Sequence, residues 1–235
     1  MIYDQAEFDI RCEWGEQGVL HLAPVSDVVI VVDVLSLAPA LIAVARGAIV
    51  FPFRSKGEGA AAFARAQGAE LAGKRGLGRF SLSPASLSQV SAGQRLVLPS
   101  PNGSTLSLAS GDTTTLAGCL RNASAVARLR RRSGAGSRSS RLASWRTGWS
   151  LRPGVEDWLG AGAIIQRLPG ALSPEARLAV DAFRSAADDI QALVSACSSP
   201  AKLIMQGFDE DVRLATTIDA DESAPCLIDG AYRHR

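Results

Sequence analysis

Asp33 is the first residue whose position suggests chemistry, because it directly follows the apolar run Val28–Val32, VVIVV. A continuous β-branched run is typical of a strand buried on both faces. In open α/β sheets ligands bind at the carboxyl ends of such strands, where a carboxylate can hold Mg²⁺, a cation that prefers oxygen ligands. The alternative is that Asp33 caps the following helix or forms an ion pair.

A second group of candidates is the sequence Asn102-Gly103-Ser104-Thr105, between a predicted strand and a short predicted helix. Backbone N–H groups from such a turn, together with two hydroxyls, can hold a phosphate group. The alternative is an ordinary Asn-Gly turn without a ligand. Spacing alone does not separate the two.

The remaining candidates are acidic or amide residues near predicted helix starts. Asn122 is a candidate site residue, although capping of the next helix explains it equally well. Glu156 and Asp157 could orient a metal ion or water, or could complement the helix dipole. Asp209 and Asp211, in GFDEDVRLA, have the same two interpretations, with a surface acidic cap favoured.

The elements that must position these residues alternate between strand and helix. The strand 28–32, the helix 35–46 and the strand 48–53 predict a βαβ unit with parallel strands and a right-handed crossover. Pro39 would lie in the first turn if the helix starts near Ala38, and Gly47 would end it. Further predicted strands are 95–98 and 113–118; predicted helices are 59–71, 106–110, 122–131, 155–168, 173–197 and one within 206–217. Residues 73–88 and 99–105 are predicted loops, and 216–232 a polar tail with an apolar patch at 226–228.

This alternation predicts a single α/β domain over residues 1–235, a three-layer α/β/α sandwich with a mixed, largely parallel sheet. Net charge is +2, too small to suggest a nucleic-acid or membrane partner. The four cysteines are not at CxxC spacing and only two histidines are present, which argues against zinc. With no apolar segment approaching membrane length and no signal peptide, we expect a cytoplasmic protein.

Residues 128–152 do not fit the alternation, because they are dense in Arg, Ser and Gly where a strand is due. The stretch is either a disordered basic loop or an anion-binding patch. A third interpretation is two compensating frameshifts. With GC-rich codons of our choice, the bases for residues 137–147 regroup to spell VAVVPAGELADG, a buried strand and an acidic turn. We therefore expect residues 134–148 to be aberrant, and poor solubility or local disorder to follow.

Taken in order, several blocks resemble the 2-phosphosulfolactate phosphatase family, in its bacterial branch. They are VVIVVDVLS, AVARGA, RFSLSPASL, SPNGST, LRNASAVA, LRPGVEDWLGAGAII and GFDEDVRLA. The resemblance runs from about Val28 to Tyr232. It implies a three-layer α/β sandwich and Mg²⁺-dependent hydrolysis of a phosphate ester of a sulfonated hydroxy acid.

The resemblance also implies roles for the candidates. It implies catalytic roles for Asp33, Ser36, Asn122 and Glu156, phosphate binding by Asn102, Gly103 and Ser104, and metal binding by Asp33, Asp157 and Asp211. The chain departs from the family pattern at Leu37-Ala38-Pro39, where hydroxyl residues are usual, at Gly73-Lys74, and in the Arg/Ser stretch.

The expected function is hydrolysis of 2-phosphosulfolactate or a related small phospho-acid, with Mg²⁺ as cofactor and a small phosphate ester as partner; a homodimer is left open. The alternative is a catalytically impaired homologue that binds anions through residues 130–141 without turnover. A nucleic-acid-binding protein using the same basic run is a weaker third hypothesis, because no binding motif accompanies it.

Overall fold

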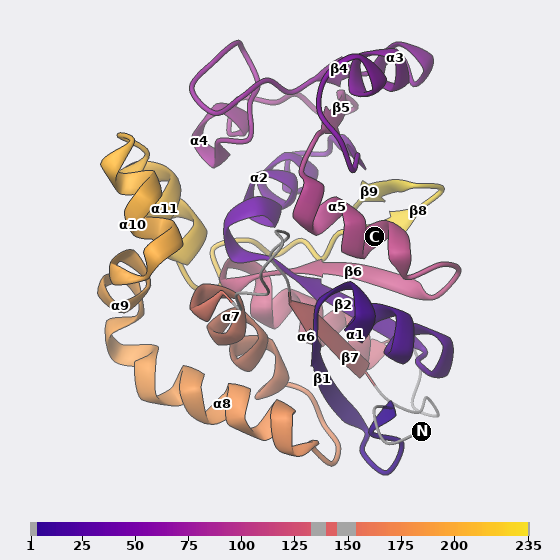
Figure 1. The fold of residues 1–235 in the computed structure, drawn as a ribbon, viewed down its shortest axis with the longest axis vertical. Coiled ribbons are helices and arrows are strands. Elements are labelled where there is room, and N and C mark those ends of the chain that lie inside the picture. Colours follow the sequence, from indigo (N-terminus) through magenta and orange to yellow (C-terminus); the bar gives the residue numbers. More distant parts are fainter. Residues whose placement is uncertain (1–3, 133–139, 145–153, 235) are drawn as a thin grey trace.

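The computed structural model describes residues 4–132, 140–144 and 154–234, and a nine-stranded sheet runs through it (Figure 1). The strand order is β1-β7-β2-β6-β8-β9-β3-β5-β4. The strands are β1 Ile10–Trp14, β2 Val28–Val32, β3 Ile49–Pro52, β4 Glu70–Leu71, β5 Arg95–Leu98, β6 Thr114–Gly118, β7 Ser140–Ser144, β8 Cys226–Ile228 and β9 Ala231–Arg233.

Helices connect most of these strands. The α-helices are α1 Gly15–Leu22, α2 Val34–Ala45, α3 Glu58–Ala66, α4 Pro84–Leu87, α5 Pro101–Ala109, α6 Ala123–Arg132, α7 Val155–Ile165, α8 Pro174–Ala186, α9 Ile190–Ala196, α10 Ser198–Met205 and α11 Asp209–Thr216. Short 3-10 turns are η2 Ala23–Val25, η3 Leu120–Asn122 and η4 Ala187–Asp189.

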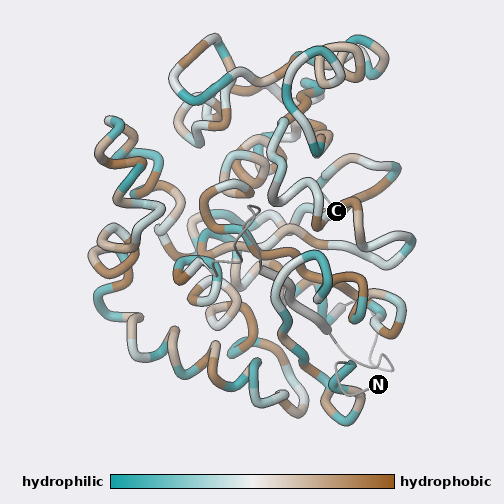
Figure 2. Tube along the Cα trace, in the orientation of Figure 1, coloured by the Kyte–Doolittle hydropathy of each residue, from teal (hydrophilic) through white to brown (hydrophobic). Residues whose placement is uncertain are grey.

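The helices cover the sheet in two groups, which confirms the predicted α/β layers. Helices α1 and α5 contact each other and strands β1, β7, β2 and β3, whereas α6, α7 and α8 contact one another and β1, β7, β2 and β6. Every residue of β2 is buried, as expected for a strand covered on both faces. In Figure 2 hydrophobic, brown stretches run through the middle of the trace, while hydrophilic, teal stretches lie mostly at its periphery.

The sheet is mixed, as predicted, but its strand directions differ from the predicted βαβ unit. Strand β2 is parallel to β6, and the pairs β6/β8, β8/β9 and β9/β3 are all antiparallel. Three reversals make β3 run opposite to β2, so the expected parallel pair with a right-handed crossover is wrong. The cause is the C-terminal hairpin β8–β9, which lies between β6 and β3 and was expected to be part of a polar tail.

Tyr232 in β9 anchors this hairpin in the core. Its side chain is fully buried, and its hydroxyl lies 2.6 Å from Ser107 Oγ of α5. Burial raises the pKa of Tyr232 well above its ordinary value. The hydroxyl therefore stays protonated and hydrogen-bonded, and the hairpin is tied to the helix that follows β5.

A strand does occupy the Arg/Ser-rich stretch, where the alternation required one. Strand β7 pairs in parallel with β1 on one side and β2 on the other. The rest of the stretch predicted to be disordered or frameshifted, residues 133–139 and 145–153, lies outside the described residues. The frameshift hypothesis stays a prediction.

Several predicted boundaries change for local reasons. The helix expected over 59–71 ends at Ala66, because Gly68 has a positive φ of 56° and the chain turns into β4. Helix α2 begins at Val34, which places Pro39 beyond its first turn. The helix expected over 173–197 is divided at η4, where Asp188 and Asp189 are poor helix formers.

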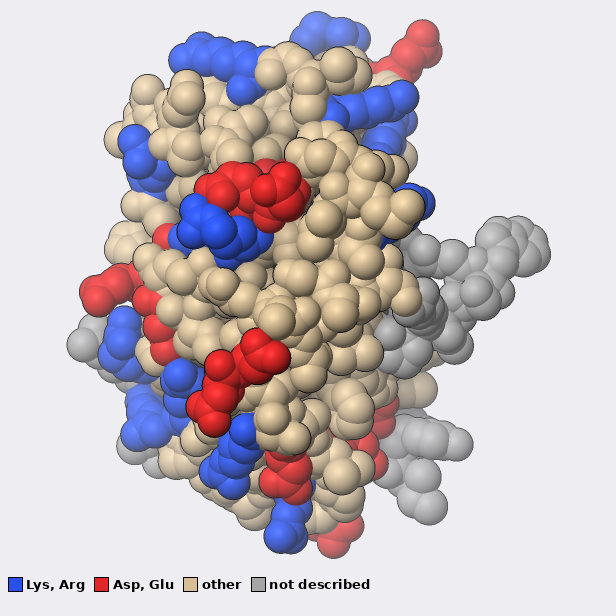
Figure 3. Space-filling view, turned by 90° about the vertical axis from the view of Figure 1, so that its left-hand side faces the viewer, with Lys and Arg blue, Asp and Glu red and all other residues tan. Residues whose placement is uncertain are grey.

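Charged side chains of both signs are interspersed over the face shown in Figure 3, as a net charge of +2 would suggest. Among the described residues, no helix combines the length and hydrophobicity needed to cross a membrane.

Candidate functional site

Asp33 lies at the junction between β2 and α2, and its side chain is only 4% exposed. It is the N-cap of α2, because its Oδ1 accepts a hydrogen bond from the backbone N–H of Ser36 at 2.9 Å. Asp33 therefore caps the helix and also presents its carboxylate at the carboxyl end of β2, so the two alternatives given by the sequence do not exclude each other. Ser36 contributes at least this N–H, and its predicted catalytic role stays a prediction.

The predicted phosphate turn is the first turn of α5, which starts at Pro101 and not near Leu106 as expected. Pro at the first position suits a helix start. The first N–H groups of a helix lack partners within the helix, and they form a site that favours anions. The backbone of Asn102 and Gly103 is in this turn; the side chain of Asn102 lies outside the described part of the structure. Ser104 is buried, and its N–H donates to the Ser100 carbonyl at 3.1 Å.

Gly103 brings this turn against the Asp33 carboxylate. A Cβ built on Gly103 would lie 3.6 Å from Asp33 Oδ2 and 3.1 Å from Leu37 Cδ2. A larger residue would thus push α5 away from α2. The absence of a side chain at this position lets the α5 backbone approach the acidic group closely.

Glu156 and Asp157 occupy the first turn of α7, and both are almost completely buried. Asp157 Oδ1 accepts a hydrogen bond at 2.7 Å from the N–H of Val34, the residue after Asp33. Gly154 makes room for this arrangement, since a Cβ there would lie 2.7 Å from Asp157 Oδ2. Two carboxylates from distant parts of the chain therefore meet at the end of β2.

Helix α2 contacts both α5 and α7, so the start of α2 is the common point of these three segments (Figure 1). Glu156 also lines a cavity of about 160 Å³ with residues 154–155 and 196–199. Asp157 of the predicted acidic pair and Gly103 of the predicted phosphate turn are thus both close to the start of α2, where Asp33 lies.

Asn122 is fully buried in η3, and its amide is bonded to the backbone. Its Oδ1 accepts from Cys119 N–H at 2.9 Å, while its Nδ2 donates to the carbonyls of Ala117 and Ser223, both at 3.1 Å. Both amide hydrogens are therefore engaged with main-chain carbonyls. The expectation that Asn122 is the N-cap of the following helix is wrong, because its Oδ1 bonds back to Cys119, the N-cap of η3. These backbone bonds account for the residue, and its catalytic role stays a prediction.

Asp211 is buried in the first turn of α11, and both of its carboxylate oxygens have partners. Oδ1 accepts from Ser83 Oγ at 2.5 Å, and Oδ2 forms an ion pair with Arg75. Sequence reasoning missed Arg75, which lies in a predicted loop 136 residues before Asp211. The serine-rich block at 81–88, at the end of the predicted loop 73–88, was the available signal.

Within residues 4–132, 140–144 and 154–234, no three His, Cys, Asp or Glu side chains gather as a metal-binding group. The predicted triad of Asp33, Asp157 and Asp211 is therefore not assembled as one cluster in this part of the chain. A site of two carboxylates still suits Mg²⁺, which keeps several waters and uses one or two carboxylates plus substrate phosphate oxygens. The magnesium site stays a prediction.

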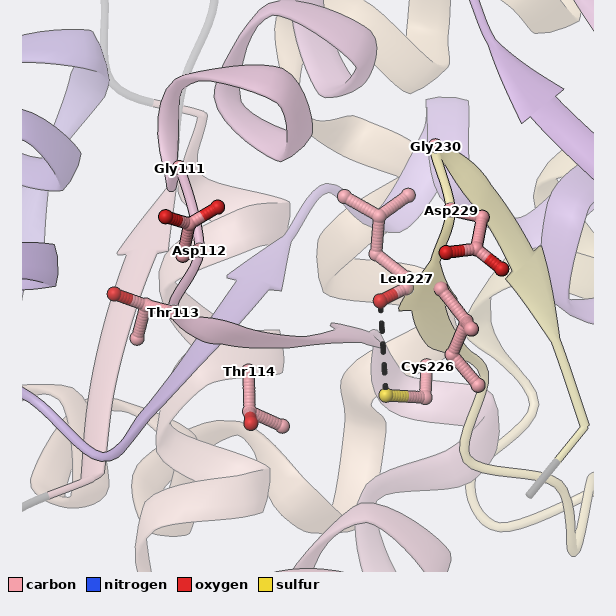
Figure 4. Close-up of a pocket in the computed structure, with 9 residues that line it drawn as sticks. Gly111, Asp112, Thr113, Thr114, Cys226, Leu227, Asp229 and Gly230 are labelled. Carbon is pink, nitrogen blue, oxygen red and sulfur yellow. Dashed lines mark hydrogen bonds between the residues drawn. The ribbon is translucent and has the colours of Figure 1, made fainter.

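A larger cavity of about 550 Å³ lies elsewhere, between the turn before β6 and the β8–β9 turn (Figure 4). Its acidic residues are Asp112 and Asp229. Strand β6 starts beside this cavity and runs parallel to β2. The cavity therefore lies at the amino ends of these strands, whereas Asp33 lies at the carboxyl end of β2. It offers acidic positions for control substitutions.

The chain is also similar in sequence to known proteins. The family model described as 2-phosphosulpholactate phosphatase matches residues 17–230. A protein named "Probable 2-phosphosulfolactate phosphatase" from Thermotoga petrophila is 34% identical over 86 residues. A protein of the same name from Thermotoga maritima is 33% identical over 86 residues. Each match covers 36% of this chain and 38% of the relative, so the chain spans less than half the length of the curated relatives it matches.

Proposed function

Because the chain belongs to the 2-phosphosulpholactate phosphatase family, we propose that it hydrolyses the phosphate ester of 2-phosphosulfolactate or of a related small phospho-acid, with Mg²⁺. The observation that carries the proposal is the meeting of three segments at the end of β2. The Asp33 carboxylate, the Asp157 carboxylate and the first turn of α5 all converge there.

Asp33 and Asp157 are the residues that would hold the metal ion. Both are nearly inaccessible, and the 2.7 Å bond from Val34 to Asp157 places the second carboxylate against the peptide that follows the first. Carboxylates held near the same strand end would repel each other when both are ionised, and a divalent cation would relieve that repulsion. When bound, Mg²⁺ would polarise the phosphoryl group and neutralise its developing charge.

The first turn of α5 would hold the phosphate oxygens through backbone N–H groups around Gly103. Gly103 allows these groups to sit beside Asp33, since its missing side chain leaves the approach open. Glu156, which precedes Asp157 in α7, would orient the attacking water or move its proton. Water adds to phosphorus, the ester P–O bond breaks, and the products are inorganic phosphate and the hydroxy acid.

The proposal is tested by phosphate release from 2-phosphosulfolactate and from a generic phosphate ester, with Mg²⁺ and with EDTA. We expect turnover with Mg²⁺, loss of turnover with EDTA, and a rate lower by about a hundredfold or more in Asp33→Asn, because this substitution removes one charged ligand.

The matched control is Asp229→Asn in the distant cavity. Asp229 has a positive φ of 50°, a conformation that Asn also tolerates, so this substitution should leave the rate unchanged. Equal rates in Asp33→Asn and the wild-type chain would contradict the proposed site. Absence of turnover with salt-sensitive phosphate binding would instead identify an anion-binding homologue.

A further inference from the structure

The carboxylate of Asp211 joins two parts of the chain that are distant in sequence. Its Oδ2 pairs with the Arg75 guanidinium, and its Oδ1 accepts from Ser83 Oγ at 2.5 Å. Arg75 and Ser83 lie at the two ends of one irregular segment, residues 75–83, between β4 and α4. A single buried carboxylate on α11 therefore fixes both ends of this segment.

Further contacts strengthen the same junction. The Arg75 guanidinium lies 5.8 Å from the centre of the Phe208 ring, which directly precedes α11. A Cβ on Gly76, whose φ is +78°, would lie 3.3 Å from the same ring. The end of the segment is also tied to α4, since the Ser86 hydroxyl of α4 accepts from Ser81 N–H at 3.0 Å and donates to the Ser83 carbonyl at 2.8 Å.

The segment is coupled to the candidate site through α2. Helix α4, which starts directly after Ser83, packs against α2, and α11 packs against both α2 and α4. Helix α2 begins next to Asp33. The segment also carries Arg79, and Lys74 precedes it directly, so the part of the chain that Asp211 fixes is cationic.

We propose that Asp211 is a positioning residue, whose ion pair with Arg75 and hydrogen bond from Ser83 hold residues 75–83 in place for binding of the anionic substrate. In this role Asp211 holds the segment and is not one of the metal ligands, which are proposed to be Asp33 and Asp157. The proposal rests on the proposed function for its kinetic consequence, but the structural junction can be tested without turnover.

The experiment compares Asp211→Asn, Arg75→Met and the double variant in the full chain. Hydrogen exchange of residues 75–83 should accelerate by about tenfold or more in each single variant, with little further change in the double variant, since all three lose the same interaction. Ser83→Ala should give a smaller acceleration, and it serves as the milder variant should the others fail to fold.

The matched control is Glu210→Gln, which breaks the ion pair between Glu210 and Arg213 on the same helix. Those side chains are more than half exposed, so exchange in residues 75–83 should stay unchanged. In turnover assays, Asp211→Asn and Arg75→Met should raise KM by a similar factor of about five to ten and change kcat by no more than about twofold.

Titration with Mg²⁺ separates positioning from metal ligation. A positioning residue predicts Mg²⁺ affinity within about twofold of wild type in both single variants. A loss of affinity of about tenfold or more in Asp211→Asn but not in Arg75→Met would overturn the proposal, as would unchanged exchange in both. If the wild-type chain shows no turnover, the proposed function fails, while the exchange and titration data still decide the role of Asp211.

Discussion

Strands β2 and β7 are neighbours in the same sheet, parallel and paired from Val28–Ser140 to Val32–Ser144, yet their sequences are opposite in character. Strand β2 reads VVIVV and is buried throughout, as suits a pleated central strand. Strand β7 reads SRLAS. The difference shows that the position of a strand in a sheet can be set by its neighbours and not by its own composition. Without β7, the sides of β1 and β2 that face it would both be left unpaired.

The register makes the contrast sharper at one position. Arg141 of β7 lies opposite Val29 on one side and opposite Arg11 of β1 on the other. Arg11 is 6% exposed, and its guanidinium donates to the carbonyls of Phe8, Asp4 and Ala6 at 2.7–3.0 Å. Burial lowers the pKa of Arg11. Like charges at paired positions of neighbouring strands are unfavourable, and Arg141 shares this register position.

The largest expected effect is a difference in the rate of thiol labelling between Cys12, beside β7, and Cys119, on the other side of β2. Cys12 lies in β1 opposite Leu142, whereas Cys119 follows β6, the other neighbour of β2. Burial raises the pKa of each thiol to about 12, so both remain protonated at pH 9 and react only after local opening. We expect Cys12 to react about a hundredfold faster, because β1 lies at the end of the strand order and pairs with the polar strand β7, whereas Cys119 follows the interior strand β6.

Mass spectrometry of iodoacetamide-treated protein measures this, and unfolded protein provides the reference rate for each thiol. Equal protection of Cys12 and Cys119 would break the comparison. The same pKa values determine whether the free energy of unfolding rises or falls with pH. Because the folded values exceed the ordinary thiol value of 9.0, the stability contributed by both thiols is lost as pH rises from about 9 to about 12.

A smaller effect is expected from Arg141→Val. This substitution removes the cation opposite Arg11 and supplies a β-branched residue, so the free energy of unfolding should rise by about 1 kcal/mol. Urea denaturation measures the change. Arg128→Ala, on an exposed position of α6, should be neutral. A destabilised Arg141→Val variant would show that the arginine suits its place in the sheet.

The frameshift hypothesis addresses the same contrast at the level of the gene. If two compensating frameshifts produced residues 137–147, the codons there must regroup into an apolar strand followed by an acidic turn. Codons that cannot be regrouped in this way would end that explanation, and the polar composition of β7 would then be native to the fold.

Sequence patterns predicted the strands whose own composition defines them. Val28–Val32 and Arg95–Leu98 were predicted with their observed bounds, since short β-branched or apolar runs are a local signal. The hairpin formed by Cys226–Ile228 and Ala231–Arg233 was missed as an element of the sheet. Each of its strands has only three residues, and its place between β6 and β3 depends on contacts with the whole sheet.

For the candidate site, the sequence predicted the residues but not the contacts between them. Asp33 follows a recognisable strand, and Glu156 and Asp157 open a recognisable helix, so their types and places were found. Their meeting was not readable from the residues alone, because the bond from Val34 to Asp157 spans 123 positions. The partner of Asp211 was missed for the same reason, since Arg75 lies in a segment without periodicity.

The central claim is that carboxylates from the end of β2 and the start of α7 form one site for a divalent cation. Calorimetric titration with Mg²⁺ of the wild-type chain, Asp33→Asn, Asp157→Asn and the double variant tests it most directly. We predict one Mg²⁺ site in the wild-type chain, with an affinity lower by about tenfold or more in each single variant. Because both carboxylates serve the same site, the loss of affinity in the double variant should be smaller than the two single losses multiplied together. Unchanged Mg²⁺ binding in both single variants would contradict the claim.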